Sequence, residues 1–154
     1  MILFLENLLR SHLLICIFLA VILLAVFLMA NDTNRLSLIL FISLSSNFLL
    51  FNYFLIASDN YNYTVHLPLH LCYLTEIVIL CTYFLNLKFM LPWLILNSLG
   101  GGITGFTNSN LGQDVHIIEY IHLYLSHFNL LLFSIIMFKK KFIINKINFY
   151  KSII

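Results

Sequence analysis

The stretch HLPLHLC, residues 66–72, places a cysteine and two histidines inside an apolar run. Cys72 lies two residues after His70, and Glu76 follows one helical turn later on the same helix face as Cys72. Pro68 fits the first turn of a helix, where its missing N–H would have no partner. A helix that begins there holds the Cys72 thiol near the positive end of the helix dipole, which favours a reactive thiolate.

A second polar set lies in HIIEYIHLYLSHFN, residues 116–129. At about 100° per residue, a helix here carries two adjoining polar stripes. The first stripe consists of Glu119, His122, Ser126 and Asn129. The second stripe consists of His116, Tyr120 and His127. If both polar sets lie toward the same membrane surface, the side chains that could meet are His70, Cys72, His122 and His127.

These residue types permit acyl transfer. A Cys72 thiolate would attack an ester carbonyl, hold the acyl group as a thioester and pass it to a hydroxyl, while a histidine moves the proton in both half-reactions. The candidates for orienting that histidine are Glu76, Glu119 and Tyr120. The candidates for donating to the oxyanion are Ser126 and Asn129.

The same residues leave other roles open. His66 and His70, at i and i+4, could ligate one metal ion, with His122, His127 and the glutamates as further ligands, although the sequence contains no HExxH or CxxC motif. Glu76 and Glu119 could instead pass a proton or solute through the membrane. As a last alternative, the polar groups only hydrogen-bond helices together. We expect no bound metal and no cofactor.

The elements that must position these residues are membrane spans. Of the 154 residues, 62% are hydrophobic and 9% are charged, and the mean hydropathy is +1.00. These values exclude a soluble globular protein. A span needs about 20 apolar residues, and the candidate spans are 12–30, 36–57, 65–86, 88–105 and 116–138. We therefore expect an all-α, polytopic transmembrane helical bundle of about five spans, with residues 1–154 forming a single transmembrane domain.

The spans differ in polar content. The first is nearly free of polar residues, and the second carries residues that we interpret as hydrogen-bonding links between helices: Ser43, Ser45, Ser46, Asn47 and Asn52. The fourth ends in a glycine-rich stretch that either packs closely on another helix or shapes a substrate slot, with Gly100, Gly101, Gly102 and Gly105. A tight turn is expected at 86–88, and Cys16, Cys72 and Cys81 are expected to be free thiols.

Basic residues predict the orientation. Arg10 falls on one side of the membrane, and the opposite side carries Arg35, Lys88, Lys139, Lys140, Lys141, Lys146 and Lys151. Because cytoplasmic loops hold the excess of Lys and Arg, we expect a multi-pass protein of the cell membrane with an outside N-terminus and a basic cytoplasmic tail over 139–154. The small net charge of +2 gives no indication of nucleic-acid binding.

Three motifs together carry a family resemblance. HLPLHLC, LNSLGGGITGFTNSNL (96–111) and IHLYLSHFNLLL (121–132) resemble, in order and spacing, the bacterial YwaF-type integral membrane proteins and the related transmembrane protein 164 acyltransferases. The most distinctive part is PLHLC, residues 68–72, and the resemblance covers roughly residues 60–138.

The resemblance implies an acyltransferase that moves fatty acyl chains between phospholipids. It implies Cys72 as the nucleophile and His127 as the base, with His70 beside the cysteine. Supporting polar groups are expected to be His66, Glu76, Glu119, His122 and Ser126. The expected partners are phospholipid and lysophospholipid, with a homo-oligomer compatible with this role. Relatives continue with further spans, so we expect this chain to be a shortened version.

Overall fold

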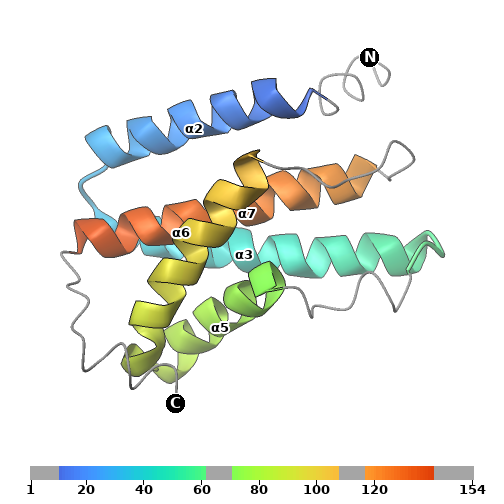
Figure 1. Ribbon diagram of the computed structural model, residues 1–154. Coiled ribbons are helices and arrows are strands. Elements are labelled where there is room, and N and C mark those ends of the chain that lie inside the picture. The colour runs from blue at the N-terminus through green and yellow to red at the C-terminus, as the bar shows by residue number, and fades with distance from the viewer. Residues whose placement is uncertain (1–10, 62–70, 108–116, 141–154) are drawn as a thin grey trace.

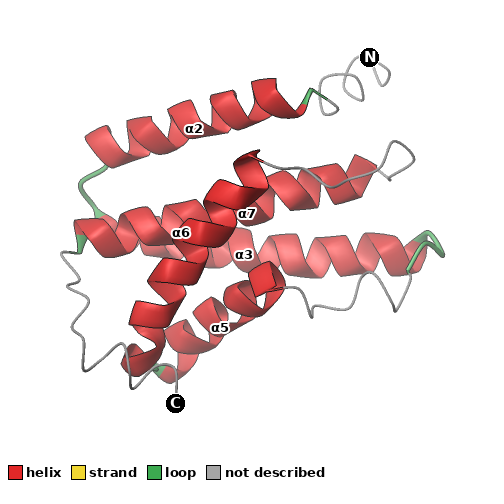
Figure 2. Cartoon of the chain, viewed as in Figure 1, coloured by secondary structure: helices red, strands yellow, loops and turns green. Residues whose placement is uncertain are grey.

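The structure is a computed structural model, and it describes residues 11–61, 71–107 and 117–140. Every regular element in these ranges is a helix (Figure 2). In chain order the elements are α2 (His12–Met29), α3 (Thr33–Ala57), α5 (Leu71–Leu85), the short 3₁₀ helix η1 (Lys88–Met90), α6 (Leu91–Thr107) and α7 (Ile117–Lys139). The prediction of an all-α helical bundle is confirmed.

The helix α7 forms the centre of the bundle. It packs against α2, α3, α5 and α6, and 56% of its most apolar stretch is buried, compared with 11% for α2. Figure 1 shows α2, α3 and α7 running along the same direction, whereas α6 crosses in front of α7 at a slant. Successive helices run in opposite directions. The described helices therefore alternate in direction between two ends of the bundle.

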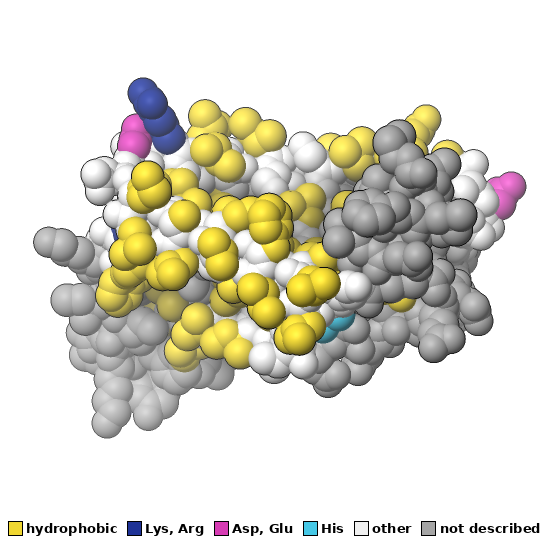
Figure 3. All heavy atoms as spheres, turned by 90° about the horizontal axis from the view of Figure 1, so that it is seen from above, with side chains coloured by type: hydrophobic (Ala, Val, Ile, Leu, Met, Phe, Trp, Pro, Cys, Tyr) yellow, Lys and Arg dark blue, Asp and Glu magenta, His cyan; other side chains and the backbone are white. Residues whose placement is uncertain are grey.

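Four helical segments are long and apolar enough to cross a membrane: α2, α3, α7 and the continuous stretch Lys88–Thr107. The remaining helix, α5, is apolar and is described over 15 residues. Residues 65–70 of the predicted third span lie outside the described residues. In Figure 3 hydrophobic side chains cover the middle of the visible face, and charged side chains stand only toward its two ends. This distribution fits a multi-pass membrane protein.

The second helix begins earlier than predicted. The sequence suggested a start at residue 36, whereas α3 starts at Thr33. The Asp32 carboxylate accepts hydrogen bonds from the backbone N–H groups of Asn34 and Arg35 at 3.0 and 3.1 Å. Because this cap satisfies N–H groups that the first helical turn cannot pair, the polar connection contributes to the helix.

The connection between α5 and α6 is the tight turn that the sequence predicted. Asn86 adopts a left-handed backbone conformation with φ 54°, which asparagine tolerates better than most residues. The 3₁₀ helix η1 follows, and α6 then begins at Leu91. This short reversal places the end of α5 and the beginning of α6 at the same end of the bundle.

The two ends of the bundle are named here. The site end is where α2, α5 and α7 begin and where α3 and α6 finish. The basic end is the opposite one, and it holds Arg35, Lys88, Lys139 and Lys140. These are all the Lys and Arg residues that the structure describes.

Candidate functional site

The predicted site residues that the structure describes lie at the site end. Cys72 and Glu76 belong to the first turns of α5, and the first half of α7 contributes Glu119, His122, Ser126 and His127. His66, His70 and His116 lie outside the described residues. Within the described ranges, no three His, Cys, Asp or Glu side chains gather into a metal site.

A hydrogen-bond network joins α3 to α7. The Asn47 amide N–H donates to Ser126 Oγ at 3.1 Å, and Asn47 Oδ1 lies 3.1 Å from His122 Nδ1. An amide oxygen only accepts, so His122 carries its proton on Nδ1. Its other nitrogen, Nε2, is 3.4 Å from Ser126 Oγ. Ser43 extends the same interface by donating to Asn129 Oδ1 at 2.8 Å.

Aromatic rings enclose His122. The Phe51 ring of α3 stacks on the imidazole at 3.8 Å between centroids, with an interplanar angle of 12°. The Tyr73 ring of α5 lies at 4.8 Å and 18°. The two nitrogens and the flat face of His122 are therefore all in contact with other side chains. This histidine links three helices and is held in one orientation.

Glu76 is the buried carboxyl of the site, with 3% of its surface exposed. Its Oε1 atom has no hydrogen-bond partner among the described residues. Ionisable groups inside a membrane are costly and commonly functional, which makes Glu76 a candidate for proton handling.

Cys72 and His127 share the glycine face of α6. A Cβ atom placed on Gly101 would lie 3.3 Å from Cys72 Sγ, and a Cβ on Gly105 would collide with the His127 ring. The two glycines are four residues apart, about 6 Å along the helix axis. The thiol and the imidazole therefore lie over neighbouring turns of one helix. A Cβ at Gly105 would overlap the imidazole, whereas a Cβ at Gly101 would only press against the thiol.

The hydrogen bond of His127 defines which nitrogen can act as a base. Its Nδ1 lies 2.7 Å from the backbone carbonyl oxygen of Leu123. A carbonyl only accepts, so Nδ1 carries the proton and Nε2 holds the lone pair. The two buried histidines thus differ: the Nε2 lone pair of His122 faces Ser126 inside the network, whereas that of His127 lies on the glycine face.

Glu119, the remaining predicted acid, lies in the first turn of α7. It is close enough to Tyr73 for an electrostatic interaction, and Tyr73 stacks on His122. Glu119 and the aromatic cluster therefore lie at the same end of the bundle.

Sequence reasoning missed the contribution of α2. His12 Nδ1 lies 3.2 Å from the Tyr124 hydroxyl, and His12 Nε2 lies 3.1 Å from the backbone oxygen of Phe106. Cys16 Sγ is 3.6 Å from His12 Nε2. The signal was present, because the spacing of His12 and Cys16 by four residues places both on one face of a helix that is otherwise apolar.

One of the comparisons with known proteins gives a match. Residues 7–154 match the TMEM164 family. No curated protein and no solved structure gives a significant match. All three motifs that carried the sequence resemblance fall within the matched range. The match extends over nearly the full length of the sequence, and the chain therefore belongs to the TMEM164 family.

Proposed function

We propose that this protein is a phospholipid acyltransferase in which Cys72 is the nucleophile and His127 is the base. The observation that carries the proposal is the shared position of both side chains on the glycine face of α6, at Gly101 and Gly105. Covalent catalysis by cysteine needs a thiol and a proton acceptor on one surface that a substrate can reach. The lone pair on His127 Nε2 supplies the acceptor.

In the first half-reaction, His127 Nε2 takes the proton of the Cys72 thiol. The thiolate attacks the carbonyl carbon of an ester in the donor phospholipid, which forms the C–S bond. Collapse of the tetrahedral intermediate breaks the ester C–O bond, and His127 gives its proton to the departing glycerol oxygen. The products are a lysophospholipid and an acyl thioester on Cys72.

The second half-reaction is the reverse with a different alcohol. The free hydroxyl of an acceptor lysophospholipid loses its proton to His127 Nε2 and attacks the thioester carbonyl. The C–S bond breaks, and the thiolate regains the proton from His127. The reaction exchanges one ester for another, so it needs no metal, no cofactor and no external energy source.

The two predicted oxyanion donors lie on the α3 face of α7. Asn129 accepts a hydrogen bond from Ser43, and its buried Nδ2 has no hydrogen-bond partner among the described residues. Ser126 accepts from Asn47. Because this face is turned away from the glycine face that holds Cys72 and His127, we assign neither as the oxyanion donor. We assign His122 to positioning, because Asn47 and Ser126 hold its ring, and Glu76 to proton balance, because its carboxyl group is buried. His70 and His66 remain predicted members of the site.

The proposed setting is the cell membrane, with the basic end in the cytoplasm and the N-terminus outside. Every described Lys and Arg lies at the basic end, as the positive-inside rule requires for a cytoplasmic surface. The site end then faces the outer leaflet, where phospholipid and lysophospholipid enter the site laterally from the bilayer.

The test is acyl exchange in proteoliposomes that contain an isotope-labelled phosphatidylcholine and an unlabelled lysophospholipid. We expect Cys72→Ala to abolish transfer of the labelled chain. Cys81→Ala is the matched control, because Cys81 is another partly buried free thiol on α5, and this variant should keep wild-type transfer. Transfer that survives in Cys72→Ala but disappears in Cys16→Ala would move the nucleophile to α2 and contradict the proposal.

One observation favours a second candidate, a proton or solute carrier. The unpartnered Oε1 of Glu76 lies deep in the bundle, and such buried carboxyls commonly mark proton pathways. A carrier would tolerate Cys72→Ser and fail in Glu76→Gln. Dissipation of a pH gradient in vesicles, blocked by Glu76→Gln and unaffected by Cys72→Ser, would favour the carrier.

A further inference from the structure

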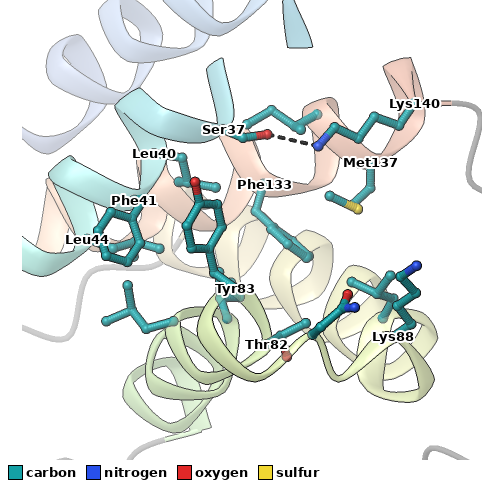
Figure 4. A pocket seen from close by; sticks show the side chains of 15 residues that line it. Ser37, Leu40, Phe41, Leu44, Thr82, Tyr83, Lys88, Phe133, Met137 and Lys140 are labelled. Carbon is teal, nitrogen blue, oxygen red and sulfur yellow. Dashed lines mark hydrogen bonds between the residues drawn. The ribbon is translucent and has the colours of Figure 1, made fainter. Parts of the chain in front are cut away.

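The basic end contains a pocket that the proposed reaction does not use. It has a volume of about 410 Å³ and lies between α3, α5 and α7, with the start of α6 at its edge. Figure 4 shows side chains from these helices lining it. Ligand sites in proteins commonly measure about 300–1,000 Å³, so this space is large enough for part of a lipid molecule.

The inner wall of the pocket is apolar and firmly packed. It includes Leu40 and Leu44 from α3, Ile79 from α5, and Phe133 and Ile136 from α7. All five side chains are at most 5% exposed and belong to the main hydrophobic core. The apolar wall is therefore already formed in the absence of a ligand. Its surface suits a hydrocarbon chain.

The outer edge of the pocket is positively charged. Lys140, directly after α7, donates a hydrogen bond to Ser37 Oγ at 3.0 Å, as Figure 4 shows. Lys88, at the start of η1, borders the same pocket. The lining contains no Asp or Glu. The acid described at this end, Asp32, forms an ion pair with Arg35 at 3.1 Å and caps α3 instead.

The depth of the pocket agrees with that of a membrane leaflet. From Ser37 at the edge to Leu44 in the wall, α3 advances seven residues, about 10 Å along its axis. This is roughly two thirds of the 15 Å that one leaflet of a hydrocarbon core occupies. A ligand that places an anion at the lysines thus extends its chain along the membrane normal.

We propose that this pocket binds an anionic phospholipid from the basic-end leaflet, with its phosphate at Lys88 and Lys140 and one acyl chain against the apolar wall. Two ammonium groups without an acidic neighbour in the pocket favour a lipid with net negative charge over a zwitterionic one. The bound lipid is not the substrate of the proposed reaction, because the pocket lies at the opposite end of the bundle from Cys72.

Native mass spectrometry of the full chain in detergent tests this proposal, with phosphatidylglycerol and phosphatidylcholine of equal chain length as probes. We expect one retained phosphatidylglycerol and at least about tenfold weaker retention of phosphatidylcholine. Lys88→Gln and Lys140→Gln should each weaken phosphatidylglycerol binding about fivefold, the usual contribution of one lysine near anionic lipid. Lys88→Arg and Lys140→Arg keep the charge and should retain the lipid.

Lys139→Gln is the matched control. Lys139 neighbours Lys140, but its ammonium lies over the Phe27 ring, 5.4 Å from the centroid, and it does not line the pocket. An equal loss of lipid in Lys139→Gln would show diffuse surface attraction and overturn the proposal. Glycerol phosphate binding as tightly as phosphatidylglycerol would reassign the site to a free anion and would also overturn it. Binding should be unchanged in Cys72→Ala, which separates this result from the fate of the proposed reaction.

Discussion

The two ends of the bundle are held together in different ways. At the site end, side-chain hydrogen bonds and stacked rings join α3, α5 and α7 around His122, and His12 ties α2 to α6 and α7. At the basic end, apolar side chains pack the same helices and leave a pocket between them. Polar contacts fix the positions of individual atoms, whereas apolar contacts mainly exclude lipid and fill space.

The difference bears on where the proposed reaction would take place. Catalysis depends on groups held to within a fraction of an ångström, and the site end supplies such positioning through Asn47, Ser126 and the glycine face of α6. The basic end offers room and positive charge, which suits binding rather than reaction. Variants at the two ends should accordingly alter different measurements.

Among variants that keep the proposed nucleophile and base, the largest effect is expected from Gly105→Ala. The new methyl group would collide with the His127 ring, so the imidazole must move away from the glycine face. A displacement of about 1 Å lowers transfer roughly 100-fold. Gly100→Ala is the matched control, because a Cβ there meets nothing within 4 Å. Acyl exchange in proteoliposomes measures both variants, and equal rates would show that His127 needs no such space.

The next largest effect is expected from Asn47→Leu. The change removes the hydrogen bonds to Ser126 and His122, and His122 then contacts α3 through the Phe51 ring. We expect a loss of about 1–2 kcal/mol in unfolding free energy and roughly tenfold slower transfer. The control is Asn52→Leu, since among the described residues the Asn52 amide bonds to Phe48 of its own helix and to no other helix. Similar stability for the two variants would show that the hydrogen bonds between α3 and α7 do not stabilise the bundle.

A smaller effect is expected from His12→Ala. This variant breaks the contacts to Tyr124 and Phe106 that hold the start of α2. Cys16, only 5% exposed, should then react about fivefold faster with a membrane-permeant maleimide, the equivalent of one lost hydrogen bond. Leu13→Ala is the control because Leu13 is 71% exposed. Unchanged labelling would mean that α2 is held by apolar packing alone.

The smallest effect is expected from Arg35→Gln. The Arg35–Asp32 pair at the basic end is exposed on both sides, and exposed ion pairs contribute little to stability. The melting temperature in detergent should not change measurably. Asp32→Ala should lower it, because Asp32 also caps α3. If Arg35→Gln proved less stable than Asp32→Ala, charge pairing would stabilise the basic end, which contradicts the view that apolar packing holds this end together.

The helices were predictable from sequence because membrane spans follow from length and apolarity alone. Four segments meet these criteria at nearly the predicted boundaries. Three of the four residues in the first predicted stripe of α7, His122, Ser126 and Asn129, do share one face and bond to α3. This face packs on α3 and not on the glycine face of α6, where Cys72 and His127 lie. Periodicity identifies which residues share a face of a helix, and these residues do share one face in the structure.

The partner of each face could not be predicted. Asn47 had been interpreted as one of several similar polar links in its span, yet it alone contacts both Ser126 and His122. His127 and His122 lie five residues apart and face different helices, α6 and α3. Which helix packs on which stripe depends on the shapes of both surfaces. The glycines of α6 leave space for His127, but the sequence does not show that α7 is the helix that fills this space.

Peptide mass mapping of acyl adducts tests the central claim most directly. The purified chain is incubated with phosphatidylcholine in the absence of acceptor, digested, and searched for acyl groups on Cys16, Cys72 and Cys81, with and without hydroxylamine. We predict a hydroxylamine-sensitive acyl group on Cys72 alone, strongly reduced in His127→Gln. Full exchange activity with no adduct on Cys72, or an adduct on Cys16 instead, would contradict the account.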